Sequence, residues 1–413
     1  MSTFVKNCIN YISGTALSQI ILFIGMPILS RLYSVDDFGH YSFFLSLLSI
    51  VGVVSCFRLE VSIPQLLGQQ TLKNIKAFSL LLNVIFSLLV FFVCFIFFCF
   101  IDNNAVILLL PVAVFLFGCF RINNFILIRS GFFNKLSISK LIQNSFCVVF
   151  QFVLFFFCGS KGLIYGYLIG FVMSLLYGYS VIDKWPFFHY IKNIIKYRIT
   201  FLIIRKHKRF IVYDSFSAFL NTLSIEISNI LFLYYLGSTV AGSYLMAQRI
   251  IGAPVTLISQ SISQVFYPTL KEKVEKNQHV AFFFKVLFFQ VSLGLFPFLL
   301  FISYSEEIFL LLLGNGWGHA GILAGYLAYS LFAQFVFVSI SYVFIVLNKQ
   351  RINMIIQFLL LSYRVFSIMV FSTIHKLSVD DLIFYFSLGS ALIYITAILI
   401  SCYYIVNEKK YGI

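Results

Sequence analysis

Residues Leu80 to Ile101 read LLLNVIFSLLVFFVCFIFFCFI, an apolar run in which Asn83 and Ser87 are the only polar side chains. Its length matches the roughly 20 residues that a helix needs to cross the hydrocarbon core of a bilayer. The apolar residues are continuous, whereas a strand of a membrane barrel would alternate apolar and polar residues. Because backbone groups in hydrocarbon must form their hydrogen bonds within the spanning structure, a helix remains as the solution.

The whole chain follows this pattern. It has 413 residues, of which 61% are hydrophobic and 10% charged, and its mean hydropathy is +0.99. In soluble domains about a quarter of the residues are charged. The composition therefore predicts an all-α integral membrane protein with almost no soluble domain. About twelve spans are expected, at 9–32, 39–63, 77–101, 105–128, 141–158, 162–182, 210–236, 240–266, 282–304, 320–347, 352–372 and 381–406. The first span is too long for a cleavable signal peptide and is expected to be retained.

The distribution of Lys and Arg supports this order of spans. With a cytoplasmic N-terminus, most of the 29 basic residues fall on the cytoplasmic side, and the opposite side holds only Arg31, Lys161 and Lys376. The sequence therefore predicts that both termini are cytoplasmic. The net charge of +15 follows largely from this topology, and a nucleic-acid partner is not needed to explain it.

A basic break divides the spans into two sets of six. We expect an N-terminal lobe at 1–182, an amphipathic cytoplasmic linker at 183–209 and a C-terminal lobe at 210–413. Gly39 and Tyr41 open the second span, and Gly242 and Tyr244 open the eighth, 203 positions later. Six spans per lobe give both lobes the same orientation, so the repeat predicts a pseudo-two-fold axis along the membrane normal, around a central cavity.

Several ionisable residues fall inside the predicted spans, where each costs roughly 2.5 to 3.5 kcal/mol unless it is compensated. At 1.5 Å per helical residue, Arg249 and Arg364 lie about 13 and 12 Å below the outer ends of their spans. Glu226 lies about 15 Å below the outer end of its own span. These residues share a level near mid-membrane. Either they line a wet cavity or they form structural ion pairs, with Glu226 the expected partner of Arg249.

The first lobe contributes Arg58, Glu60 and Arg121. Arg58 and Arg121 lie about 8 and 12 Å from the cytoplasmic ends of their spans, so each could snorkel to the headgroups or line the cavity. On a helix, residues two apart point to nearly opposite faces, and Arg58 and Glu60 are therefore not expected to neutralise each other. Glu60 lies only about 4 Å from the predicted helix end and has no assigned role.

Arginines outnumber carboxylates in the spans, which predicts a cationic cavity suited to an anion. Guanidinium groups bind phosphate through a planar fork, so phosphate or pyrophosphate is the expected ligand. We expect Arg58, Arg121, Arg249 and Arg364 to bind substrate, and Glu60 and Glu226 to serve ion coupling or structural pairing. Neither a metal site nor a cofactor is expected. Transport could be coupled to a proton or sodium gradient.

Short motifs along the chain resemble those of bacterial polysaccharide flippases of the Wzx, or O-antigen transporter, type. The resemblance rests on the following stretches: PILSRL at 27–32, DDFGxY at 36–41, RLE at 58–60, GxY at 242–244 with QRI at 248–250 and Pro254, VFYP at 265–268, and LGxGWxxAG at 313–321. Each piece is short, but their order and span positions form a fairly specific pattern.

The resemblance implies the fold of the multidrug/oligosaccharidyl-lipid/polysaccharide exporter superfamily and a place in the bacterial inner membrane. Its implied substrate is an undecaprenyl-pyrophosphate-linked oligosaccharide, moved from the cytoplasmic to the periplasmic leaflet. By motif position, the pyrophosphate would meet Arg58 and Arg249, and by depth alone Arg121 and Arg364. Membrane lipids, an O-antigen polymerase and a chain-length regulator are the further implied partners.

Two alternatives remain at this stage. An O-antigen polymerase is also a many-span protein, but it carries a large periplasmic loop, whereas the longest outer loop expected here, around Ser305 to His319, is short. An exporter of lipid II or of drugs would share the fold. A carrier of cationic drugs would need carboxylates in its cavity, and the arginine surplus argues against it.

Overall fold

A computed structural model describes residues 2–65, 69–100, 105–181, 215–347, 349–373 and 377–407. The contacts divide the chain into two compact units. The first unit comprises Met1–Tyr33 and Phe43–Glu226, and the second comprises Ser34–Ser42 and Ile227–Ile413. The predicted linker at 183–209 lies outside the described residues.

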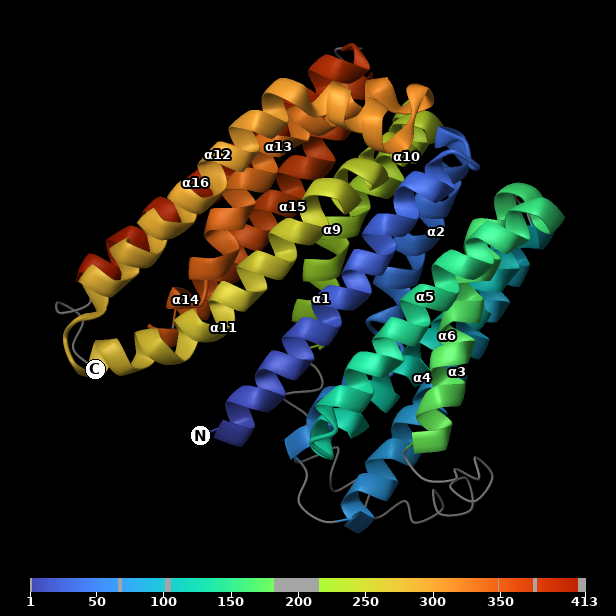
Figure 1. Cartoon of the computed structure of the whole chain (residues 1–413), viewed down its shortest axis with the longest axis horizontal. Helices are drawn as coiled ribbons and strands as arrows, with labels where there is room; N and C mark the ends of the chain where they lie inside the picture. The colour runs from blue at the N-terminus through green and yellow to red at the C-terminus, as the bar shows by residue number, and fades with distance from the viewer. Residues whose placement is uncertain are drawn as a thin grey trace. The chain divides into compact units, whose positions relative to one another are not determined.

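The first unit contains α1, α3, α4, α5 and α6. It also contains the larger part of α2 and the first half of α9. Their bounds are α1 Ser2–Ser30, α2 Val35–Gly52, α3 Gln69–Phe100, α4 Leu110–Arg129, α5 Phe133–Cys158, α6 Gly162–Val181 and α9 Ser215–Leu236. Short 3-10 turns precede α3, α4 and α6, at Leu59–Gln65, Ala105–Leu109 and Gly159–Lys161. Figure 1 shows α5 and α6 side by side, as the short turn between them requires.

The second unit contains the first turns of α2, the second half of α9 and all later helices. Their bounds are α10 Ser238–Ala247, a π-helical turn Gln248–Gly252, α11 Ala253–Glu275, α12 His279–Leu313, a 3-10 turn Asn315–Trp317, α13 Gly318–Ile340, α14 Val343–Val346, α15 Gln350–Thr373 and α16 Val379–Asn407. Within this unit α13 packs against both α12 and α16 (Figure 1).

These helices confirm the all-α membrane fold that the composition predicts. Within the described residues there is no strand, and seven helical stretches are long and apolar enough to cross a bilayer. One of those stretches, Phe133–Val181, holds both α5 and α6. Shorter apolar helices at Ala16–Ser30 and Thr222–Leu236 fall where the first and seventh spans are predicted.

Buried polar side chains link the helices of the first unit. Tyr33 donates its hydroxyl to the Gln151 carbonyl at 2.6 Å, and Gln151 Nε2 donates to the Leu163 carbonyl at 2.8 Å. Asn144 Nδ2 donates to the Ser18 carbonyl at 2.9 Å. Because these groups are buried and hydrogen-bonded, they fix the positions of α1, α5 and α6 without leaving polar atoms unpaired in hydrocarbon.

The second span ends earlier than the sequence predicts. α2 stops at Gly52, turns follow to Arg58, and a 3-10 helix occupies Leu59–Gln65. Phe57 and Arg58 have φ of 47° and 51°, in the left-handed region that non-glycine residues rarely adopt. The expectation that Arg58 and Glu60 project from opposite faces of one α-helix is therefore wrong, because this stretch is not α-helical.

The internal repeat appears as a reciprocal crossing of α2 and α10 inside the second unit. A Cβ on Gly39 would overlap the Ser238 carbonyl oxygen, and a Cβ on Gly242 would overlap that of Val35. Positions 35 and 238 are separated by the same 203 residues as positions 39 and 242. Such exchange of contacts is what a local two-fold axis generates. It confirms that the repeated glycines are structurally equivalent, and both are required by close backbone approach.

α12 is longer than the predicted span at 282–304. It runs from His279 to Leu313, with Pro297 inside it and a kink at Tyr304, where φ is −124° and ψ is 23°. The stretch expected as an outer loop from Ser305 is therefore helical up to Leu313. Glu306 and Glu307 lie on this helix.

Candidate functional site

The break after α2 holds a buried ion pair. Arg121 Nη2 of α4 lies 2.6 Å from Glu60 Oε1, and the Glu60 side chain is only 1% exposed. Arg121 Nη1 also donates to the Val53 carbonyl at 3.3 Å. The guanidinium lies 5.8 Å from the ring centre of Phe117, one turn earlier on α4. The pair thus compensates two charges that would otherwise be costly to bury.

The irregular backbone is what places Glu60 opposite α4. Residues 53–58 turn instead of continuing α2, and this frees carbonyl groups such as that of Val53 for Arg121. Arg58, half-buried, lies in the left-handed conformation immediately before the 3-10 helix. Strained residues of this kind persist where the surrounding structure determines them, and they occur often at functional sites.

Glu226 of α9 is half-buried and accepts a hydrogen bond from Ser46 Oγ of α2 at 2.7 Å. The Ser46 side chain is fully buried. A hydroxyl donor is a neutral partner for a carboxylate, and it satisfies one oxygen without adding a positive charge. Glu226 is thus anchored to α2 in the first unit by a residue 180 positions earlier in the chain, a contact that no sequence pattern predicts.

Arg249 lies in the π-helical turn Gln248–Gly252 that joins α10 to α11. Proline has no N–H, so Pro254 cannot donate to the Ile250 carbonyl, and its ring would collide with that group in a regular helix. A π turn widens the helix locally and relieves this collision. The QRIIGAP stretch therefore produces a local widening, and Arg249 is carried on it. Single π turns are frequent at functional sites.

The Arg249 guanidinium lies over an aromatic ring. Its central carbon is 5.2 Å from the ring centre of Tyr41 on the first turns of α2, and Tyr41 is buried. A cation placed on a ring face is worth about 0.5 to 2 kcal/mol, more where water is excluded. Arg249 remains half-buried, so part of its donor surface is accessible. Arg364, on α15, is 8% exposed.

Two helices begin with the same tetrapeptide, Ser-Val-Asp-Asp. Ser34 and Asp37 cap α2 reciprocally, and Ser378 and Asp381 cap α16 in the same way, with hydroxyl-to-carboxylate distances of 2.8 and 2.6 Å. The cap uses the last residue of each tetrapeptide. The preceding aspartate is left to contact a neighbouring helix.

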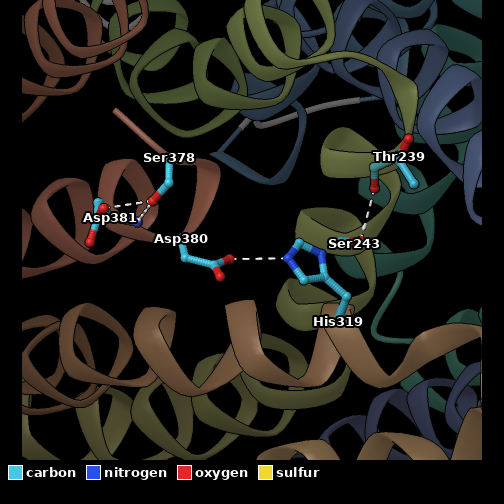
Figure 2. Close-up of polar contacts among 6 residues, drawn as sticks. All are labelled: Thr239, Ser243, His319, Ser378, Asp380 and Asp381. Carbon is cyan, nitrogen blue, oxygen red and sulfur yellow. Dashed lines mark hydrogen bonds and ion pairs between the residues drawn. The ribbon is translucent and has the colours of Figure 1, made fainter. Parts of the chain in front are cut away.

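Those two aspartates, Asp36 and Asp380, bind different partners. Asp36 accepts hydrogen bonds from Ser238 Oγ and Thr239 Oγ1 of α10, at 2.7 and 3.1 Å. Asp380 lies 3.0 Å from His319 Nε2 of α13, as Figure 2 shows beside the Ser378–Asp381 cap. Both contacts are exposed, and they connect the N-terminal ends of helices in the second unit.

An ion pair of a different kind lies at the far end of α11. Lys276 Nζ is 2.5 Å from Glu272 Oε1, and both side chains are 58% exposed. The hydrogen bond from Lys276 lowers the pKa of Glu272. This pair lies outside the predicted spans. Exposed pairs of this type contribute little to stability.

The six residues that the sequence selects thus lie in different surroundings. Glu60 and Arg121 are brought together, and Glu226 lies against Ser46. Arg249 lies against Tyr41, and the G-x-Y repeat had already marked that tyrosine without assigning it a partner. In the residues that the structure describes, no group of three or more His, Cys, Asp or Glu side chains could hold a metal ion.

Comparison with known proteins places this site in a family context. A family model described as polysaccharide biosynthesis protein matches residues 28–321. The matched region includes Arg58, Glu60, Arg121, Glu226 and Arg249. No curated protein sequence matches the chain.

Solved structures share the fold at low sequence identity. An inward-facing multidrug resistance MATE family transporter of the MOP superfamily aligns with a TM-score of 0.65 and 14% identity, covering 97% of this chain and 96% of its own. The lipid II flippase MurJ, in an inward closed conformation, aligns with a TM-score of 0.67 and 16% identity, covering 96% and 90%. A MOP superfamily transporter from Pyrococcus furiosus aligns with a TM-score of 0.62 and 14% identity, covering 98% of this chain and 96% of its own.

Proposed function

The chain belongs to the polysaccharide biosynthesis protein family, and from this premise we propose that it is a flippase for lipid-linked oligosaccharides. The proposed cargo is an oligosaccharide repeat unit of the O-antigen type on undecaprenyl pyrophosphate. It is carried from the cytoplasmic to the periplasmic leaflet of the bacterial inner membrane by alternating access. No covalent step is assigned to the chain.

One observation carries the choice of an anionic cargo. Arg249, predicted to lie near mid-membrane, is held on a π turn against the face of Tyr41 rather than buried completely. A ring face stabilises the cation without occupying its hydrogen-bond donors, so the guanidinium retains the fork that binds phosphate oxygens. This supports Arg249 as the principal pyrophosphate-binding residue.

The proposal assigns secondary roles to the other five residues. Arg58, Arg121 and Arg364 contact the same anion at further stages of transport. Arg121 already contacts Glu60, so its contact with pyrophosphate would exchange one anionic partner for another. Glu60 and Glu226 are the carboxylates available for coupling to a proton or sodium gradient. The O-antigen polymerase and chain-length regulator would act on the delivered units.

The transport step is tested in a host whose own O-antigen flippase gene is deleted. Expression of this chain, together with the glycosyltransferases of its own gene neighbourhood, is expected to move lipid-linked repeat units to the periplasmic leaflet. Accumulation of the units on the cytoplasmic leaflet, with polymerase activity intact, contradicts the proposal. Restoration of growth after loss of the lipid II flippase, without repeat-unit export, favours lipid II as cargo.

The role of Arg249 is tested in the same assay. We expect Arg249→Ala to reduce export by about two orders of magnitude, since a hydrogen bond to a charged group is worth about 1.5 to 3 kcal/mol and Arg249 can form two. Arg249→Lys should restore export only partly, because lysine lacks the fork. Lys285→Ala, which removes an exposed cation of α12, is the matched control. Normal export by Arg249→Ala at equal abundance excludes the role.

A further inference from the structure

Two adjoining cavities lie in the second unit, and they differ in chemistry. The larger, of about 480 Å³, is lined by side chains of α12, α13 and α16 that are all apolar or aromatic. The smaller, of about 240 Å³, is lined by residues of α12 and α13 that include Glu306, Glu307 and Tyr326. Ile302 and Tyr329 line both, so the two cavities adjoin. Together they form a groove with an apolar stem and an acidic end.

The shape of α12 creates this groove. Gly294 brings α12 against Phe332 and Phe335 of α13, since a Cβ there would lie 3.0 Å or less from both rings. At the other end Ser305 approaches Gly325, whose added Cβ would lie 2.6 Å from the Ser305 hydroxyl. Between these contacts α12 contains Pro297, and at Tyr304 it is kinked. The apolar stem runs beside α12 from Leu287 to Ile302, a stretch that includes Pro297 and ends just before the kink, and Figure 1 shows α12 and α13 running together.

The apolar stem is open at the surface of the helices. Leu295, Leu299 and Leu392 line it and are 46%, 54% and 55% exposed. Exposed apolar side chains on a spanning helix suit contact with lipid tails, so we expect the stem to be open to the bilayer. From Leu287 to Ile302 the stem follows α12 for about 22 Å at 1.5 Å per residue, which exceeds the roughly 15 Å of hydrocarbon in one leaflet. A hydrocarbon chain therefore fits the stem by chemistry and by length.

We expect the acidic end to lie at the level of a membrane–water interface. Tyr326 and Tyr329 line the smaller cavity, and Tyr329 also lines the larger one. Tyrosines gather at headgroup level in membrane proteins. Glu306 lies on α12 two residues beyond residue 304, where the sequence predicts the end of this span. A chain held in the stem would thus place its headgroup beside Glu306 and Glu307.

Charge decides which lipid suits this site. Two exposed carboxylates line the acidic end, and among the described residues that line it there is no Lys, Arg or His. Carboxylates accept hydrogen bonds from an ammonium group and repel a pyrophosphate. We propose that this groove binds a bilayer phospholipid whose headgroup carries a protonated primary amine, as in phosphatidylethanolamine. The inference concerns a lipid that stays in the bilayer, and it does not depend on the cargo proposed above.

The test measures lipid binding to the purified full chain after delipidation. Phosphatidylethanolamine and phosphatidylglycerol with identical acyl chains are titrated separately, and bound lipid is counted by native mass spectrometry alongside the thermal unfolding midpoint. We expect the amine lipid to bind about tenfold more tightly and to raise the midpoint more. Equal binding of the two lipids overturns the proposal.

Variants locate the site. The double variant Glu306→Gln with Glu307→Gln should lose the tenfold preference, and Glu272→Gln with Glu275→Gln, which removes exposed carboxylates of α11, should keep it. Ile395→Trp fills the stem from its exposed rim and should weaken both lipids, whereas Leu293→Trp, on α12 but outside the lining, should not. If the double variant folds poorly, Glu307→Gln alone must reduce the preference. A retained preference, or tighter binding of a polyprenyl pyrophosphate at this groove, overturns the proposal.

Discussion

α2 and the α10–α11 helix, which are the second and eighth predicted spans, begin with the same G-x-Y element, yet they continue differently. α2 stops at Gly52 and gives way to turns with positive φ at Phe57 and Arg58. Its counterpart widens through a π turn and remains helical to Glu275. Each irregularity carries an arginine of the predicted site, Arg58 in the first and Arg249 in the second.

The difference shows two ways of keeping charge inside a membrane protein. The broken segment brings in a full counter-charge, because Glu60 pairs with Arg121 at 2.6 Å. The continuous helix offers Arg249 the face of Tyr41, which is neutral. Glu60 occupies a hydrogen-bond donor of Arg121, whereas the ring face of Tyr41 occupies none of the donors of Arg249. The predictions below test this contrast, from the largest expected effect to the smallest.

Removal of one member of the buried pair should have the largest effect. Glu60→Gln leaves Arg121 without its counter-charge, and we expect a loss of about 3 kcal/mol in unfolding free energy. Thermal unfolding in detergent and abundance in the membrane measure it. Glu60→Met combined with Arg121→Met should recover much of this stability, since neither charge remains. A double variant as unstable as Glu60→Gln would show that the loss comes from packing.

Substitution of either glycine at the α2–α10 crossing should destabilise the protein to the same extent. Gly39→Ala and Gly242→Ala each force a methyl group into a carbonyl oxygen of the other helix, and we expect about 1 to 3 kcal/mol of destabilisation from each. The same unfolding assay applies. Gly316→Ala is the control, because nothing lies within 4 Å of an added Cβ there. Unequal losses from the two substitutions would mean that the repeats are not equivalent at this crossing.

Variants of Tyr41 distinguish a cation–ring contact with Arg249 from simple packing. Tyr41→Phe keeps the ring beneath Arg249 and should change export little, whereas Tyr41→Leu removes it and should reduce export by several-fold, corresponding to about 0.5 to 2 kcal/mol. Export of repeat units at equal protein abundance is the measurement. Equal export by the two variants would show that the ring does not position the guanidinium.

The exposed His319–Asp380 contact should have the smallest effect. Asp380→Asn removes a pair whose side chains are 55% and 43% exposed, and we expect less than about 1 kcal/mol of change. Thermal unfolding at low and at high salt measures it. A loss as large as that of Glu60→Gln would contradict the view that burial, rather than pairing itself, gives the Glu60–Arg121 pair its importance.

Most of the fold follows from the sequence, because spanning helices are specified by apolar length alone and the repeat by residues that recur at one spacing. The caps of α2 and α16 are equally local, since Ser and Asp three residues apart satisfy the first free N–H groups of a helix. Six ionisable residues could also be selected from sequence, because any charge in an apolar run needs an explanation.

Only the tertiary structure decided what each of those residues contacts. The apolar stretch continues through VVSCFRLEVSIP at residues 53–64, so the end of α2 at Gly52 has no compositional signal. Helical spacing argued only that Glu60 does not pair with Arg58, and it named no partner for Glu60. The partners are distant in sequence: Arg121 for Glu60, Ser46 for Glu226 and Tyr41 for Arg249. A pattern records how apolar each segment is, whereas a pairing depends on which helices pack together and how their backbones bend.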